Sequence, residues 1–365
     1  MIRIGMVGVG AISGIYLENI TKTFKEIELS AVCDLVRERA EKAQEKYGVP
    51  KIYDTMQELF ADPDIDIVLN LTRPYEHYEV TRQGLEAGKH VYSEKPLGAA
   101  WDEGVKLVKL AESKGLYLGG APDTFLGAGI QTCRRLIDAG MIGQPVAALA
   151  CLACHGHETW HPDPAFYYQF GGGPMLDMGP YYITALINLL GGVKSAVGVT
   201  KTSFSQRVIT SEPHAGTVVD VEVPTHINGI LTFDSGAVAT ITTSFDVFPN
   251  EGIKLEIYGT EGTLVCPDPN TFGGPIKIIR GEDKSNAHEV PVMFHYTENS
   301  RALGLADLAK AIETKRSPRA SYKQTLHVLE IMTTLNGGSG NTVQLSTKYE
   351  REAPMVKTPL AGVLD

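Results

Sequence analysis

The chain has 365 residues, of which 43% are apolar and 21% are charged, and its formal net charge is −10. This length predicts two domains at roughly 150 residues each, and the ordinary composition excludes a disordered, collagen-like or disulfide-scaffold protein. An acidic chain without a basic stripe is a poor binder of nucleic acid or of anionic membranes. Without an export signal or an apolar run of roughly 18 residues, we expect a cytoplasmic protein whose five cysteines stay reduced.

Short apolar runs alternate with polar helical stretches through the first 120 residues. Strands that alternate with helices of this length predict βαβ units and a parallel sheet covered on both faces. The predicted strands are Ile2–Val7, Leu29–Cys33, Ile65–Leu71, His90–Ser93 and Leu116–Gly119. The predicted helices are Ala11–Thr23, Arg37–Tyr47, Glu76–Ala87 and Trp101–Lys114.

Strand signals dominate the remainder of the chain, with short turns at 233–236 and 259–262 that are typical of hairpins. The predicted strands here are Val146–His157, Val218–Phe233, Ala237–Phe245, Lys254–Tyr258 and Thr263–Val265, and the predicted helices are Gly129–Ala139, Ser300–Thr314 and Ser321–Leu335. The fold class is therefore α/β. A doubly wound parallel domain is predicted over 1–120, and an α+β domain with a large open, mostly antiparallel sheet over 121–365. The sequence also allows the C-terminal helices of the second domain to pack against the first domain.

A glycine-rich turn follows the first predicted strand and opens the first predicted helix. Gly8 permits the tight turn, Gly10 lets the backbone approach a pyrophosphate, and the helix N-terminus supplies free N–H groups. Ser13 takes the place of the usual third glycine, and its hydroxyl is expected to reach a phosphate. Asp34 ends the second strand, where a carboxylate binds an adenosine ribose and repels a 2′-phosphate. This Rossmann pattern favours NAD over NADP, although the nearby Arg37 and Arg39 leave the choice open.

Further motifs appear in a fixed order: Asn70-Leu71-Thr72-Arg73-Pro74 with His77, then Glu94-Lys95-Pro96, then the glycine-rich stretch 171–181 that contains Asp177. Together they resemble the Gfo/Idh/MocA family, the glucose–fructose oxidoreductase and inositol dehydrogenase group, over nearly the whole chain. The resemblance implies a nicotinamide-dependent oxidoreductase that acts on a sugar, a cyclitol or a similar polyol.

The resemblance also implies three catalytic residues. Lys95 would lie between nicotinamide and substrate, and Asp177 would touch the reacting substrate. The family often has histidine at the position of Tyr181, and some members have tyrosine there. The base is therefore left open between Lys95 and Tyr181. The residues expected at the cofactor are Gly8, Gly10, Ala11, Ile12, Ser13, Asp34, Leu71, Thr72, Arg73, Pro74, His77, Glu94, Lys95 and Trp160.

Hydrogen-bonding side chains are dense in the segment 155–161, which leads into the glycine-rich stretch. The period of two along a strand places His155 and His157 on one face, and the Trp160 indole offers a surface for a sugar ring. Asp123 and Phe125 follow the fifth strand, where open α/β sheets bind ligands. The absence of arginine from 121–128 argues against a phosphorylated substrate. The residues expected at the substrate are Lys95, Asp123, Phe125, His155, His157, Trp160, Asp177 and Tyr181.

Cys151, Cys154 and His155 match the string that attaches c-type haem. On a strand, residues three apart point to opposite faces, so these cysteines would not grip one ion or haem together. We therefore expect no metal.

The favoured hypothesis is an NAD-dependent dehydrogenase that oxidises a hydroxyl of a non-phosphorylated sugar or cyclitol, either an aldose C1 to a lactone or an inositol to an inosose. An alternative is an NAD-dependent enzyme that cleaves a glycoside through transient oxidation without net redox change. A non-catalytic sensor is disfavoured because both Lys95 and Asp177 are present. Family members commonly associate through the C-terminal sheet, so we expect a homodimer or homotetramer. The alternating residues that suggest this are Ile227, Gly229, Leu231, Phe233, Val238, Thr240 and Thr242.

Overall fold

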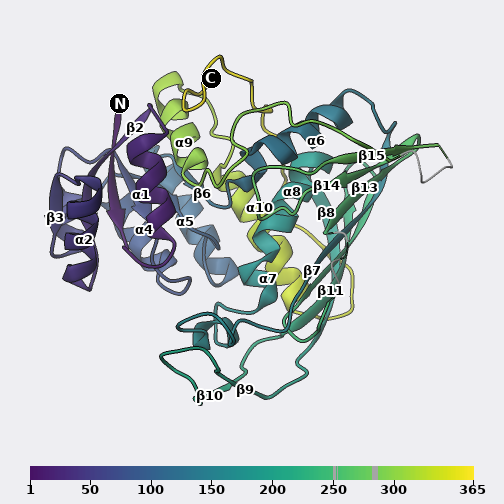
Figure 1. Cartoon of the computed structure of the whole chain (residues 1–365), viewed down its shortest axis with the longest axis horizontal. Coiled ribbons are helices and arrows are strands. Elements are labelled where there is room, and N and C mark those ends of the chain that lie inside the picture. Colours follow the sequence, from purple (N-terminus) through teal and green to yellow (C-terminus); the bar gives the residue numbers. More distant parts are fainter. Residues whose placement is uncertain (250–251, 253, 282–286) are drawn as a thin grey trace. The chain divides into compact units, whose positions relative to one another are not determined.

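The structure, a computed structural model, describes residues 1–249, 252, 254–281 and 287–365. It divides into two compact units (Figure 1). The first contains 1–127, 294–326 and 352–365, and the second contains 128–293 and 327–351. The first unit therefore includes a helix, α9 (Leu303–Thr314), that lies far along the chain from its parallel strands and contacts β6 (Leu118–Gly120).

A six-stranded, all-parallel sheet forms the centre of the first unit, in the order β3-β2-β1-β4-β5-β6. Its other strands are β1 (Ile2–Val7), β2 (Ile27–Cys33), β3 (Lys51–Tyr53), β4 (Ile67–Asn70) and β5 (His90–Ser93). The accompanying helices are α1 (Ser13–Lys22), α2 (Arg37–Tyr47), α3 (Met56–Ala61), α4 (His77–Glu86), α5 (Trp101–Lys114) and the short η1 (Thr124–Leu126). The predicted doubly wound parallel sheet is confirmed, with one additional edge strand, β3.

The central strands form because their apolar runs are buried on both faces. Every residue of β4 is buried, as are the last four of β1, and strands of this kind read as continuous apolar runs. β3 and α3 were not predicted from the sequence because both are short. Thr55 and Glu58 nevertheless form a capping box at the start of α3, which is a sequence signal for a helix N-terminus.

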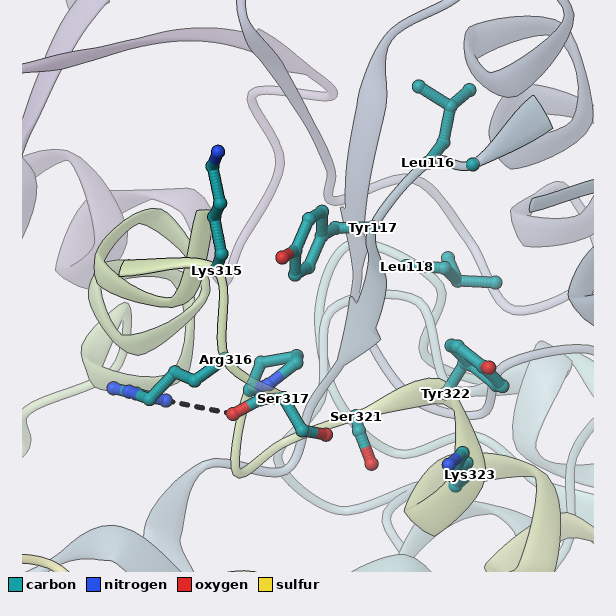
Figure 2. Close-up of a pocket in the computed structure, with 11 residues that line it drawn as sticks. Leu116, Tyr117, Leu118, Lys315, Arg316, Ser317, Ser321, Tyr322 and Lys323 are labelled. Atoms are coloured by element: carbon teal, nitrogen blue, oxygen red, sulfur yellow. Dashed lines mark hydrogen bonds between the residues drawn. The ribbon is translucent and has the colours of Figure 1, made fainter. Parts of the chain in front are cut away.

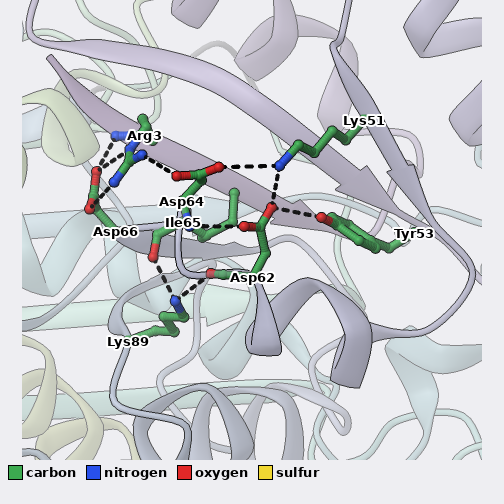
Figure 3. A network of polar contacts seen from close by, with 8 residues as sticks. All are labelled: Arg3, Lys51, Tyr53, Asp62, Asp64, Ile65, Asp66 and Lys89. Atoms are coloured by element: carbon green, nitrogen blue, oxygen red, sulfur yellow. Dashed lines mark hydrogen bonds and ion pairs between the residues drawn. The ribbon is translucent and has the colours of Figure 1, made fainter.

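A polar network joins the amino ends of the strands in the first unit (Figure 3). Arg3 in β1 donates to Asp66, just before β4, and to Asp64 at 2.7 Å. Lys51 in β3 donates to Asp62 at 2.8 Å, and this bond with that of the Tyr53 hydroxyl holds the pKa of the Asp62 carboxyl well below its ordinary value. The network fixes the edge strand at the end of the sheet opposite to the loops that follow the strands.

The second unit is built on a nine-stranded sheet in the order β16-β15-β14-β13-β7-β12-β11-β8-β17. All of its neighbouring strands run antiparallel except the pair β7 and β12, so the sheet is mixed and mostly antiparallel, as predicted. Its strands are β7 (Pro145–Ala153), β8 (Val193–Lys201), β11 (His226–Phe233), β12 (Val238–Ser244), β13 (Leu255–Gly259), β14 (Gly262–Cys266), β15 (Lys277–Arg280), β16 (Ala287–Glu289) and β17 (Val343–Gln344). A separate ribbon pairs β9 (Gln206–Val208) with β10 (Val218–Asp220).

Helices complete the second unit, and the outer face of its nine-stranded sheet is the face that carries Ile230. The helices are α6 (Ala128–Asp138), η2 (Ala165–Tyr168), α7 (Pro174–Asp177), α8 (Gly179–Leu190) and the second part of α10 (Tyr322–Asn336), whose residues divide between the two units. In β11, Ile227 and Leu231 are buried whereas Ile230, on the other face, is about half exposed. No helix in the described part of the chain is long and apolar enough to cross a membrane.

Candidate active site

The loops after β1 and β4 meet where the strand order of the parallel sheet reverses, since β1 pairs with β2 on one side and with β4 on the other. Gly8 has a φ of +95°, and a Cβ at this position would lie 2.8 Å from the carbonyl carbon of Leu71. Only glycine permits both the backbone conformation and the approach of the two loops. Such a reversal point, at the carboxyl ends of parallel strands, is where dinucleotides bind in open α/β sheets.

The N-terminus of α1 is open for an anion. No side chain caps the helix, its first turn holds no acidic residue, and Ala11 and Ile12 are exposed. A Cβ built at Gly10 meets nothing within 4 Å, so a phosphate has room beside this backbone. Free N–H groups and the positive end of the helix dipole suit a pyrophosphate here. The residues present therefore fit the dinucleotide that the sequence predicts.

The structure corrects the role expected of Ser13. Its side chain is buried, and its hydroxyl donates a 2.7 Å hydrogen bond to the carbonyl of Gly10. The hydroxyl thus closes the turn and is not directed at a phosphate.

Asp34 has a structural bond that the sequence did not reveal. One carboxylate oxygen accepts a 2.6 Å hydrogen bond from the N–H of Val9, and the other accepts one of 2.8 Å from Val36. A carboxylate offers about four acceptor positions, so both oxygens retain capacity for ribose hydroxyls. Arg39 approaches the carboxylate only to 4.0 Å. Asp34 therefore holds the glycine loop in place, and its side chain is 8% exposed.

Lys95 follows β5 beside a buried glutamate. The N–H of Lys95 donates to Oε2 of Glu94 at 2.9 Å, and the hydroxyl of Tyr16 in α1 donates to Oε1 at 2.7 Å. Glu94 is buried and serves to position the start of the Lys95 loop against α1. Tyr16 is a positioning residue that the sequence analysis missed, because one tyrosine on a helix gives no motif.

The His77 ring lies between two loops. Its two ring nitrogens lie 2.8 Å from the carbonyl oxygen of Pro96 and 3.0 Å from that of Thr72. The ring is buried, and burial lowers its pKa. It thereby links the loop after β4, containing Leu71 to Pro74, with the loop that carries Lys95. Thr72 is further fixed by bonds from its N–H and its hydroxyl to Asn70.

Asp123 and Phe125 are buried rather than open to a substrate. Asp123 accepts a 3.1 Å hydrogen bond from the N–H of Gly304, in the first turn of α9. Burial raises the pKa of Asp123 to about 6. Both residues therefore act in packing, which corrects the expected substrate contact. The strand-end position alone did not distinguish a ligand-facing carboxylate from one that holds a helix.

Stability should depend on pH through Asp123. Because its pKa lies above the ordinary value of about 3.9, the folded state binds this proton more tightly than the unfolded chain. The stabilisation is present below about pH 4 and is lost as the pH rises through about 6. Asp123→Asn keeps an oxygen for Gly304 and removes the charge. Its free energy of unfolding relative to wild type should therefore rise by about 2–3 kcal/mol between about pH 4 and pH 8. Urea titrations at both pH values measure this, and a constant difference would contradict it.

Asp177 and Tyr181 lie near the N-terminus of α8 in the second unit. The N–H of Asp177 donates to the carbonyl of Gly173 at 3.0 Å, and that of Tyr181 donates to Met178 at 3.1 Å. The imidazole Nε2 of His157 lies 3.4 Å from Oδ2 of Asp177. The structure therefore joins a predicted substrate residue to a predicted catalytic one.

His155 and His157 do not share one set of contacts as the period of two predicted. The strand β7 ends at Ala153, and Gly156 has a φ of +86°, so the alternation stops before these residues. The ring of His155 stacks on Phe248 at 3.7 Å and meets the edge of Phe204. The ring of His157 instead lies against other aromatic side chains, namely Tyr167, Phe245 and the largely exposed Trp160.

A buried ion network fixes the loop that carries these histidines. Arg207 in β9 donates to Glu158 at 2.9 Å and to Asp246 at 2.7 Å. The hydroxyl of Tyr168 also donates to Glu158, and all three charged side chains are buried. No local sequence pattern predicts this network, because it joins three distant segments.

A separate pocket of about 320 Å³ lies in the first unit, at the amino end of β6 (Figure 2). Residues 115–118, which lead into β6, form one wall, and residues 315–318 and 321–323 form the other. The Arg316 guanidinium donates to the Ser317 carbonyl there. The pocket contains none of the predicted site residues, so it is distinct from the candidate dinucleotide site.

Comparison with known proteins decides the family. The oxidoreductase family Gfo/Idh/MocA, described by its NAD-binding Rossmann fold, matches residues 2–120. The C-terminal domain of the same family matches residues 130–265. The chain belongs to the Gfo/Idh/MocA family.

Relatives of this Gfo/Idh/MocA protein include two inositol dehydrogenases. It is 26% identical to myo-inositol 2-dehydrogenase of Thermotoga maritima, over 72% of this chain and 74% of the relative. It is 24% identical to scyllo-inositol 2-dehydrogenase (NAD(+)) of Bacillus subtilis, over 95% and 97%. A solved structure of levoglucosan dehydrogenase with NADH and L-sorbose has a TM-score of 0.80 at 17% identity, covering 95% of this chain and 99% of that chain. At 17% identity, the similarity to levoglucosan dehydrogenase shows a shared fold.

Membership of the Gfo/Idh/MocA family agrees with the open phosphate loop and makes the chain an NAD-binding oxidoreductase. The family motifs had singled out Lys95 and Asp177 from the sequence alone. The motifs gave no indication of Tyr16 or of the ion network around Glu158, because these residues lie outside the motif sequences.

Proposed function

We propose that the protein is an NAD-dependent dehydrogenase that oxidises a hydroxyl of a non-phosphorylated sugar or cyclitol. The observation that supports this most is the open N-terminus of α1 beside Asp34, in a chain of an oxidoreductase family. The relatives named for inositols favour a ring polyol. The reaction would give a lactone from an aldose or an inosose from an inositol.

The chain's own residues would bind the cofactor and handle the proton. The backbone from Gly8 to Ile12 would bind the pyrophosphate and Asp34 the ribose. When bound, the nicotinamide supplies the acceptor for the hydride, and the protein is left to position the substrate and to take the hydroxyl proton. For positioning the substrate and for the path of its proton we keep Lys95, Asp177 and Tyr181. A general base in place contributes about 10²–10⁴-fold to the rate.

A panel of sugars and cyclitols, each with NAD and with NADP, tests the proposal. Absorbance of the reduced cofactor should rise with at least one neutral polyol and NAD. A glycoside that is cleaved without accumulation of reduced cofactor would instead support the glycoside-cleaving alternative. If no member of the panel gives either result, the proposal is wrong.

The cofactor preference should depend on Asp34. Wild type should prefer NAD, because the carboxylate repels a 2′-phosphate. Asp34→Asn keeps an oxygen for the Val9 N–H and removes the charge, so it should narrow the preference by about 1–3 kcal/mol, the scale of a charged hydrogen bond. Asp34→Ala should narrow it similarly and also destabilise the loop. Dissociation constants for both cofactors measure this, and a wild type that prefers NADP would contradict it.

We also propose a homodimer or homotetramer formed through the outer face of the second unit's sheet. Ile227 and Leu231 are buried, whereas Val199, Ile230 and Val238 are exposed on that face. Exposed apolar side chains on a broad sheet are commonly covered by a partner. Sedimentation at micromolar concentration should give twice or four times the mass of 39.5 kDa, and a monomer would refute the proposal.

A further inference from the structure

The contact between His157 and Asp177 has a geometry suited to a ligand. Nε2 of His157 and Oδ2 of Asp177 are 3.4 Å apart, and the two side chains are 13% and 16% exposed. Nε2 is buried and has no hydrogen-bond partner among the residues that the structure describes. The two atoms therefore lie within ion-pair distance but form no hydrogen bond with each other. A buried nitrogen left in this state costs free energy unless a ligand bonds to it.

Local structure holds the ring in this position. The left-handed backbone of Gly156 turns the chain out of β7, and a Cβ there would collide with Glu158 and with the Tyr168 hydroxyl. Glu158, the residue next to His157, is tied to Arg207 at 2.9 Å. The ring is thus fixed through its own backbone, as a catalytic group needs to be.

The surroundings of the ring are mostly aromatic. Its centroid lies 4.3 Å from that of Tyr167, 4.6 Å from Phe245 and 5.3 Å from Trp160. Among charged groups, Asp177 lies 3.4 Å from Nε2, and His161 interacts electrostatically with His157. Glu158 is already neutralised by Arg207 and bonded by Tyr168. Asp177 is therefore the charge that acts most directly on the imidazole.

We propose that His157 is the proton acceptor of the oxidation and that Asp177 binds the neighbouring hydroxyl of a vicinal diol. This inference rests on the proposed function. The oxidised carbon loses a hydride to the oxidised nicotinamide cofactor, its O–H bond breaks, and the proton goes to Nε2 of His157 as the C=O bond forms. The imidazolium then releases the proton to solvent. Adjacent ring hydroxyls are spaced closely enough to reach Nε2 and Oδ2 together.

The chemistry favours an imidazole over a phenol for this role. An unperturbed phenol is protonated near neutral pH, whereas an imidazole changes charge there. Position 181 holds tyrosine, and His157 brings an imidazole to Asp177 from the loop after β7. In this account Tyr181 and Lys95 orient the substrate.

Loss and chemical rescue of the imidazole test the proposal. His157→Ala should lower kcat by at least about 100-fold, and added imidazole should restore at least about 10-fold. His157→Asn should show the same loss without rescue, because its side chain leaves no room for imidazole. The exposed His214, between β9 and β10, provides the control, and His214→Ala should keep wild-type kcat. Fluorescence titration with NADH should give similar affinity for all four proteins, which shows that the cofactor site is intact.

Two further measurements examine the pair itself. In the protein without cofactor, Asp177→Asn should shift the ring ¹⁵N signals of His157 and leave those of His214 unchanged. A cyclitol that lacks the hydroxyl next to the oxidised carbon should have a kcat/KM at least about 10-fold below its parent, the scale of one hydrogen bond to a charged group.

The outcomes separate this inference from the proposed function. Turnover of His157→Ala within about threefold of wild type, or a loss that imidazole does not relieve, would overturn the inference while the dehydrogenase activity stands. Unchanged ¹⁵N signals, or equal kcat/KM for the deoxy cyclitol, would also overturn the pairing. If no polyol supports NAD reduction by the wild-type protein, the proposed function is wrong, and the inference fails with it.

Discussion

Replacing Lys95 with methionine is expected to lower turnover by about 100-fold or more, the usual effect of losing a positioned acid–base or charged group. Methionine keeps the apolar stem and removes only the ammonium group. The affinity for NAD should change little, because the backbone of the Gly8 loop and Asp34 bind the other half of the cofactor. Steady-state kinetics together with NADH fluorescence titration measure both quantities.

Comparing the loss of turnover in Tyr181→Phe with that in Lys95→Met shows what the phenol does. If the phenol only orients the substrate, its loss should be milder than that of Lys95. If the phenolate takes the proton, the two losses should be comparable. A Lys95→Met protein with a lower Tm but with turnover within a few-fold of wild type would show that Lys95 is structural.

Arg207→Met is expected to destabilise the second unit by about 3–5 kcal/mol, the cost of leaving a buried charge without its partner. The Arg207 side chain is only 5% exposed, and its loss leaves the carboxylates of Glu158 and Asp246 buried. Trp160 lies in the second unit and Trp101 in the first. Urea unfolding followed by Trp160 fluorescence in a Trp101→Phe background therefore measures this effect.

Arg280→Met is the matched control for Arg207. Arg280 pairs with Glu261 at 3.2 Å, and both side chains are about half exposed. Exposed ion pairs contribute about 0–1 kcal/mol, so this variant should unfold almost as wild type does. Equal effects of the two substitutions would mean that the Arg207 network does not hold the histidine loop.

The sequence predicted the parallel sheet well because its strands are buried apolar runs that end in turns. The bounds of α2, α5 and β5 were predicted to the residue. In contrast, α8 was not predicted, and its residues are all buried. A helix that is apolar on every side has no period of 3.6 to detect.

The candidate site was predictable where a motif specifies the backbone, as at Gly8, Asp34 and Lys95. It was not predictable where distant residues decide the direction of a side chain. Asp123 bonds to the N–H of Gly304, 181 residues further along the chain. His157 meets Asp177 because Gly156 ends the strand alternation and Arg207 anchors Glu158. These contacts depend on tertiary structure that a local pattern does not record.

Transfer of a deuterium label tests most directly whether the protein is a dehydrogenase. A polyol that supports NAD reduction is prepared with deuterium on the carbon to be oxidised, and the nucleotide is analysed by mass spectrometry after the reaction. We predict one deuterium in each reduced nicotinamide formed and an equal amount of ketone or lactone. Unlabelled nucleotide together with a product that retains its deuterium would contradict net hydride transfer.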